Sequence, residues 1–148
     1  MRAFTVHQPY AYAYAIVAGL KPHETRSRRT SIRGRVAVHA GLRDITVNEM
    51  KLCETYIPTG TILAMGAVVG TVEIVDCVPV EEVIGALTPQ ERAVGDYSPG
   101  RWAWLLKNPV MFDMPIYARG KQGWWEWDEG LPEWKRFLKN RFERTEKL

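Results

Sequence analysis

The 148-residue sequence lacks several features that mark common classes of protein. It has only two cysteines, Cys53 and Cys77, which form no CxxC pair; we expect both to be reduced and buried, with a disulfide as the alternative. No apolar run approaches the ~20 residues that span a bilayer, so we expect no membrane segment. The N-terminus has neither the apolar core nor the cleavage site of a signal peptide, which predicts a cytoplasmic protein.

The motifs of several enzyme classes are also missing. The three histidines, His7, His23 and His39, are not spaced by three or four residues and have no cysteine or carboxylate at ligand spacing, so we predict no metal site. No glycine-rich phosphate loop occurs, and the GKQG run at 120–123 is too short and generic to count as one. No serine has the context of a nucleophile elbow. We expect no cofactor.

Acidic residues are scarce in the first part of the chain. Residues 1–43 carry eight Lys or Arg and one acid, Glu24, whereas the remaining residues carry twelve bases and sixteen acids. This basic asymmetry favours a phosphate-bearing partner such as a nucleic acid or nucleotide. The alternative is that surface arginines merely solubilise one end of the molecule.

The stretch from His7 to Arg28 organises the rest of the sequence. Pro9 suits the first position of a helix and Gly19 suits the left-handed residue that closes one, which predicts a helix of nine or ten residues. Its apolar stripe is Tyr10, Ala13, Ile16 and Val17. Polar groups lie before and after this helix: His7, Gln8, Lys21, Glu24, Arg26 and Arg28.

Strand patterns dominate the remainder of the chain. We expect strands at 2–6, 20–27, 35–40, 66–78, 101–106 and 111–119, and helices at 43–56, in short turns over 79–93, and from about 131. Pro22 indicates an edge strand, and Gly70 indicates a bend or a close backbone approach. No linker divides the chain, so residues 1–148 are expected to form one α+β domain, a small closed β-barrel of five to six strands with peripheral helices.

Glu73 stands in the most apolar strand, among valines and an isoleucine. If that strand is covered on both faces, the carboxylate needs a partner, and Lys21 or Arg26 is the expected one. The alternative is an exposed glutamate on an edge face. Lys21, Glu24 and Arg26 themselves suit either a simple ion pair or a phosphate anchor with a base.

Aromatic residues are abundant, with six tryptophans. Most are expected in the core, and one or two of them, with Tyr10 or Tyr12, could present a ring for base stacking beside arginines. The expected C-terminal helix has a basic face opposite its apolar stripe, which is either solvated or a nucleic-acid patch.

The pattern H-Q-P-Y-A-x-A-x-x-x-x-x-G-x-K-x-x-E-x-R-S at 7–27 resembles the ASCH domain, a family named for homology to the activating signal cointegrator and part of the PUA-like superfamily. Matching pieces follow in the family's order and cover most of residues 3–127: R-G-R-V-A-V-H-A (33–40), G-A-V-V-G-T-V-E-I-V-D-C (66–77), K-N-P (107–109) and R-G-K-Q-G-W-W-E-W (119–127). The resemblance implies a small β-barrel with a cleft lined by the G-x-K-x-x-E-x-R segment, and work on RNA or nucleic acid.

The resemblance implies two different activities. One branch of the family hydrolyses N4-acetylcytidine with a Lys, a Thr three residues later and a Glu; Lys21 and Glu73 match, but Glu24 occupies the Thr position. Ribonuclease activity is also ascribed to relatives. At Arg28, cointegrator-like sequences carry Trp, and this exchange favours phosphate contact over base stacking.

Our leading hypothesis is therefore an RNA- or nucleic-acid-binding ASCH domain whose positively charged cleft takes a nucleotide or a single-stranded segment. The expected binding residues are His7, Gln8, Lys21, Glu24, Arg26, Ser27 and Arg28, with Glu73 orienting the cations. The alternative is a small hydrolase of RNA or a modified nucleoside with Lys21, Glu24 and Glu73 as catalytic residues. A protein-interaction domain is the third reading.

Overall fold

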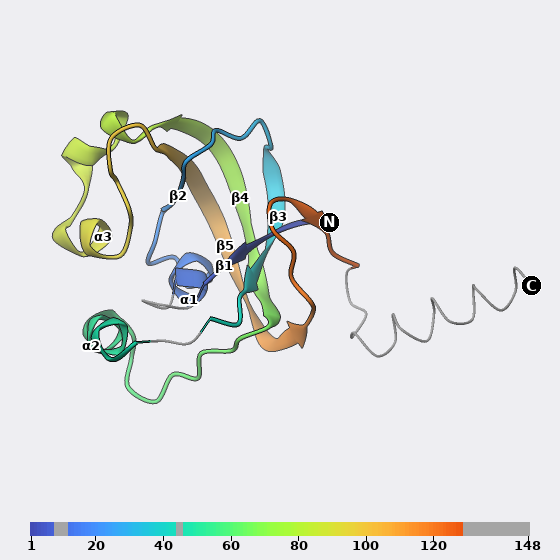
Figure 1. Ribbon diagram of the computed structural model, residues 1–148. Coiled ribbons are helices and arrows are strands. Elements are labelled where there is room, and N and C mark those ends of the chain that lie inside the picture. Colours follow the sequence, from blue (N-terminus) through green and yellow to red (C-terminus); the bar gives the residue numbers. More distant parts are fainter. Residues whose placement is uncertain (8–11, 44–45, 129–148) are drawn as a thin grey trace, which may run out of the picture.

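The computed structural model describes residues 1–7, 12–43 and 46–128 (Figure 1). Its framework is a mixed sheet of six strands in the order β2-β5-β4-β3-β1-β6. The strands are β1 (Arg2–Val6), β2 (His23–Arg26), β3 (Gly34–Ala40), β4 (Ala67–Pro79), β5 (Trp102–Tyr117) and β6 (Trp125–Glu126). The helices are α1 (Tyr12–Val17), α2 (Val47–Tyr56) and α3 (Pro89–Ala93), with 3-10 turns η2 (Val80–Glu82) and η3 (Ile84–Ala86).

The long antiparallel strands β3, β4 and β5 form the centre of the sheet. Their β-branched residues suit a pleated and buried surface, and Val36 pairs directly with Val72. The close backbone approach that Gly70 predicts is confirmed, because a Cβ there would lie 2.1 Å from the carbonyl oxygen of Val110 and 2.8 Å from Val17. A side chain at this position would push α1 and β5 away from β4.

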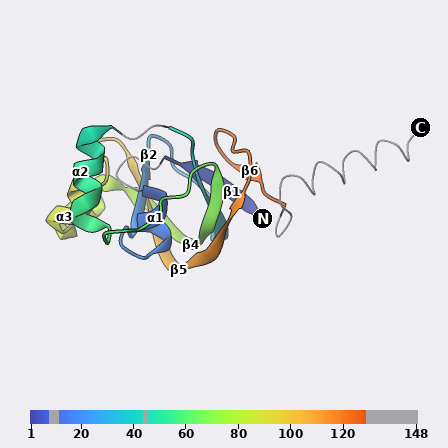
Figure 2. The same cartoon turned by 90° about the horizontal axis from the view of Figure 1, so that it is seen from below.

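Helix α1 covers the middle of the sheet (Figure 2). Ala13, Ile16 and Val17 are buried against the sheet, as the apolar stripe predicts, and they join a core cluster that includes Phe4 and Trp104. Small residues on α1 let the helix approach the strands closely. Helices α2 and α3 lie at the end of the molecule away from β6.

The expected barrel is the main correction to the fold. The α+β class is confirmed, but within the described residues the sheet is open, with β2 at one end of the strand order and β6 at the other. Strand β6 has only two residues and β2 only four, so neither offers enough backbone to close the sheet. The expected edge position of the segment after Pro22 is confirmed.

Other expectations differ in detail. The strands expected at 101–106 and 111–119 form one strand, β5, whose pairing with β4 is interrupted by register shifts. Cys77 is a free, buried thiol. None of the helices in the described ranges combines the length and apolar character needed to cross a bilayer. The expected helix from about 131, together with Tyr10 and Gln8, lies outside the described residues.

Candidate functional site

The basic segment that leads into β2 is largely buried. Lys21 is only 3% exposed; its Nζ donates a hydrogen bond to the carbonyl oxygen of His23 and lies 5.4 Å from the ring centre of Tyr12. Burial lowers the pKa of Lys21, and the nearby Glu24 carboxylate only partly offsets this effect. Lys21 is therefore a costly buried cation with few partners.

Glu24 and Arg26 lie on the same side of β2, as their spacing predicts. Oε2 of Glu24 is 3.7 Å from Nη2 of Arg26 and accepts no hydrogen bond within the described residues. The Arg26 guanidinium donates to the carbonyl oxygen of Thr5 at 2.9 Å and lies over the rings of Phe4 and Trp104, at 5.8 and 5.4 Å. These contacts hold Arg26 in one place while leaving its side chain partly exposed.

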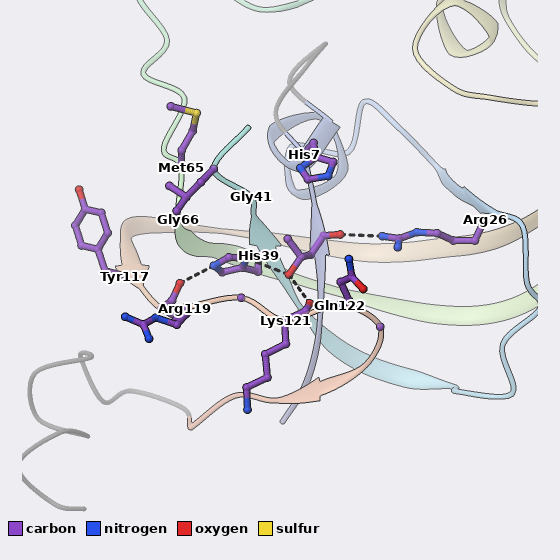
Figure 3. A pocket seen from close by; sticks show the side chains of 15 residues that line it. His7, Arg26, His39, Gly41, Met65, Gly66, Tyr117, Arg119, Lys121 and Gln122 are labelled. Carbon is purple, nitrogen blue, oxygen red and sulfur yellow. Dashed lines mark hydrogen bonds between the residues drawn. The ribbon is translucent and has the colours of Figure 1, made fainter. Parts of the chain in front are cut away.

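A cavity of about 870 Å³ opens beside Arg26 (Figure 3). Its walls come from the ends of β1 and β3, the residues just before β4, and the segment that follows β5. Among the described residues, the lining has no carboxylate and includes five basic or imidazole side chains: His7, Arg26, His39, Arg119 and Lys121. Such a lining is suited to an anionic group.

His39 fixes the wall that follows β5. This buried residue lies between two partners: Nδ1 is 3.2 Å from Oγ1 of Thr5, and Nε2 is 2.7 Å from the carbonyl oxygen of Ala118. Because a carbonyl can only accept, Nε2 donates, and neutral His39 then accepts from the Thr5 hydroxyl. Burial lowers the pKa of His39, which favours this neutral form.

Gly120 packs directly on this pair. A Cβ at Gly120 would lie 2.5 Å from Cε1 of His39 and 2.8 Å from Oγ1 of Thr5, so no larger residue fits without displacement. The indole Nε1 of Trp125 also lies 3.3 Å from Oγ1 of Thr5. These contacts anchor the loop that carries Arg119 and Lys121.

Arg119 and Lys121 are the cations in this cavity that are available to a ligand. Neither side chain forms an ion pair or a hydrogen bond with another described residue. The backbone N–H groups of residues 119–123 also donate to no described residue. A loop whose N–H groups and two cationic side chains have no partner among the described residues resembles an anion site.

The structure separates the residues that the sequence grouped together. His7 and Arg26 line the cavity, whereas Lys21 and Glu24 are buried and outside its lining. Exposed Ser27 and Arg28 also lie outside the lining, and Gln8 lies outside the described residues.

Glu73 has a different partner from the one expected. It stands opposite Arg35 in the β3–β4 register; its Oε1 is 3.2 Å from Nη2 of Arg35, and its Oε2 accepts from Asn108 at 3.0 Å. The expectation that Lys21 or Arg26 pairs with Glu73 is wrong, because the cross-strand neighbour is closer. In the described ranges, no three His, Cys, Asp or Glu side chains gather where a metal could bind.

Sequence reasoning found His7 and Arg26 but missed the other residues of the cavity, among them Tyr117, Arg119 and Lys121. The signal for Arg119 and Lys121 was the run R-G-K-Q-G at 119–123, which is too short to identify a phosphate loop by pattern alone. What makes the run notable is its position beside Arg26 and His39, which come from distant parts of the chain.

Comparisons with known proteins place the fold in a family. The model of the ASCH domain matches residues 4–125. Similar solved structures include ASCH from Zymomonas mobilis (TM-score 0.53, 16% identity, covering 93% of each chain) and a tyrosine-to-phenylalanine mutant (0.53, 16%, 95% of this chain and 96% of that one). At this identity the likeness concerns the fold alone. No curated protein matches the sequence.

Proposed function

Since the chain belongs to the ASCH domain family, whose PUA-like fold is associated with RNA binding, we propose that it binds RNA or another nucleic acid in the cavity beside Arg26. The ligand is a nucleotide or a single-stranded segment. The observation that carries the proposal is a lining with Arg26, Arg119 and Lys121 and, in the part of the chain that the structure describes, no carboxylate. Glu24 then supports Arg26 from within the fold, and His7 lies at the cavity wall.

The cations of the cavity differ in strength as phosphate ligands. Arg26 is partly neutralised by Glu24 at 3.7 Å and already donates to Thr5. Arg119 and Lys121 have no such partners among the described residues. Because phosphate binding releases counterions, the two unpaired cations should dominate the dependence of affinity on salt.

Fluorescence anisotropy with a labelled single-stranded RNA tests this proposal. Lys121→Ala and Arg119→Ala should each weaken binding and reduce the slope of log affinity against log salt by about 1. Lys107→Ala is the matched control, since this exposed lysine lies outside the cavity lining and should change little. An affinity that does not change between low and moderate salt would contradict the proposal.

A small hydrolase is the second candidate, favoured by one observation. Lys21 is buried with a lowered pKa beside Glu24, whose Oε2 has no hydrogen-bond partner in the described residues; a buried lysine with a lowered pKa is a frequent feature of catalytic sites. Glu73, the third residue of that hypothesis, is held by Arg35 instead. Turnover of N4-acetylcytidine or a short RNA that is lost in Lys21→Ala while RNA binding remains would support it; no turnover by the wild type would exclude these substrates.

A further inference from the structure

The cavity beside Arg26 has a second, apolar wall. Leu42 and Tyr117 are 77% and 69% exposed, and Met65 is also exposed. All three line the same cavity as the basic side chains. We refer to Leu42, Met65 and Tyr117 as the apolar rim. Large apolar side chains that are exposed together beside a basic cavity suit a ligand that has both an apolar face and a negative charge.

The apolar rim is adjacent to the cations. Tyr117 is the last residue of β5 and Arg119 follows two residues later; both are exposed, they flank buried Ala118, and both line the cavity. Figure 3 shows Met65, Tyr117 and Arg119 on one side of His39 and Arg26 on the other. A ring and a guanidinium two residues apart can contact one nucleotide together.

The rim is fixed by the same contacts that fix the basic loop. Ala118 donates its N–H to the carbonyl oxygen of Gly66 at 3.1 Å, and its own carbonyl accepts from His39. Leu42 packs over Gly66 so closely that a Cβ there would lie 2.9 Å from Cδ2 of Leu42. The apolar and basic walls are therefore tied together at Ala118 rather than free to move apart.

We propose that the apolar rim takes an unpaired nucleobase, with Tyr117 as the stacking ring, while Arg119 and Lys121 take the phosphate beside it. This inference rests on the proposed function and narrows its substrate class to single strands that carry bases. A base inside a duplex is stacked on both faces, so only an unpaired base can offer its face to Tyr117. Stacking on an aromatic ring tolerates every base, so no strong sequence preference is expected.

The test compares ligands that all carry phosphates for the basic side chains but differ in whether they have an unpaired base for the apolar rim. Wild type, Tyr117→Ala and Tyr117→Phe are titrated with a single-stranded RNA, with an abasic oligonucleotide of equal length and with its duplex. Tyr117→Ala should weaken binding of the single strand roughly 5- to 150-fold and leave the abasic ligand unchanged. Tyr117→Phe should retain binding, and the slope against salt should stay the same in both variants because no cation is removed.

Met114→Ala is the control, since this residue is 79% exposed on the same strand but outside the cavity lining. Unchanged single-strand binding in Tyr117→Ala, or an equal loss with the abasic ligand, would overturn the inference while leaving salt-dependent binding intact. Tighter binding of the duplex than of the single strand would also overturn it. A wild type that binds none of the ligands would overturn the proposed function itself.

Discussion

Residues 21–26, which lead into and form β2, and residues 119–121, which follow β5, both carry basic side chains. The environments of the two segments are opposite: the first is mostly buried and the second is mostly exposed. In the first, Lys21 and Glu24 are buried, and Arg26 is held by Thr5 and two aromatic rings. In the second, the side chains of Arg119 and Lys121 are exposed and have no ion-pair or hydrogen-bond partner among the described residues. A run of charges in a sequence therefore does not say whether those charges are available to a ligand.

The difference assigns a role to each segment. A buried lysine with a lowered pKa is expensive to keep, and Glu24 is the carboxylate that partly offsets this cost. The same carboxylate lies beside Arg26, which reaches the cavity. We infer that the segment of β2 stabilises the fold and positions Arg26, whereas the exposed segment supplies the contacts to the ligand.

Replacing Glu24 should have the largest effect on stability. Glu24→Ala removes the carboxylate that lies beside Lys21 and Arg26. Removing one partner of a buried ion pair leaves the other charge uncompensated, so the free energy of unfolding should fall by about 3 kcal/mol. Urea unfolding followed by tryptophan fluorescence measures the loss. The matched change in the exposed segment, Lys121→Ala, should alter stability by less than about 0.5 kcal/mol. If both variants lost the same free energy of unfolding, the proposed difference between a buried stabilising segment and an exposed binding segment would be wrong.

Local patterns predicted much of the fold but not its closure. The apolar stripe of α1, the edge position after Pro22 and the close approach at Gly70 depend on neighbouring residues, so they could be predicted from the sequence. The open sheet could not, because it depends on how few backbone pairs β2 and β6 form.

The site was predicted only in part for a similar reason. His7 and Arg26 belong to a recognisable pattern, and both line the cavity. Arg119 and Lys121 gain their role from the contact of Gly120 with His39, about eighty residues earlier in the chain. Glu73 was assigned to Lys21 or Arg26 because the register that places it opposite Arg35 is not visible in a single sequence.

Acidification tests whether His39 supports the exposed segment. Burial lowers the pKa of His39 from 6.5, so as the pH falls below 6.5 the unfolded chain takes up a proton before the folded one does. Stability therefore decreases with acidification, by at most ~1.4 kcal/mol per pH unit for one group. His39→Gln should reduce this slope between pH 6.5 and 5, as measured by chemical denaturation at each pH.

His23→Gln is the matched control for that measurement. The pKa of His23 is also lowered, mainly by burial, but His23 contacts Tyr97 and lies outside the cavity lining. Both variants should flatten the pH dependence of stability, and only His39→Gln should also weaken RNA binding, by loosening the loop of Arg119 and Lys121. Equal RNA affinity in the two variants would contradict a positioning role for His39.

The smallest effect is expected at Glu73, the second carboxylate that the sequence singled out. Its side chain is 34% exposed, against 9% for Glu24, and it forms a surface ion pair with Arg35. Exposed pairs of this kind contribute about 0–1 kcal/mol, because water already solvates both charges. Glu73→Ala should therefore lower the free energy of unfolding by less than about 1 kcal/mol and leave RNA binding unchanged. A loss as large as that of Glu24→Ala would mean that β4, and not β2, carries the buried charge on which the fold depends.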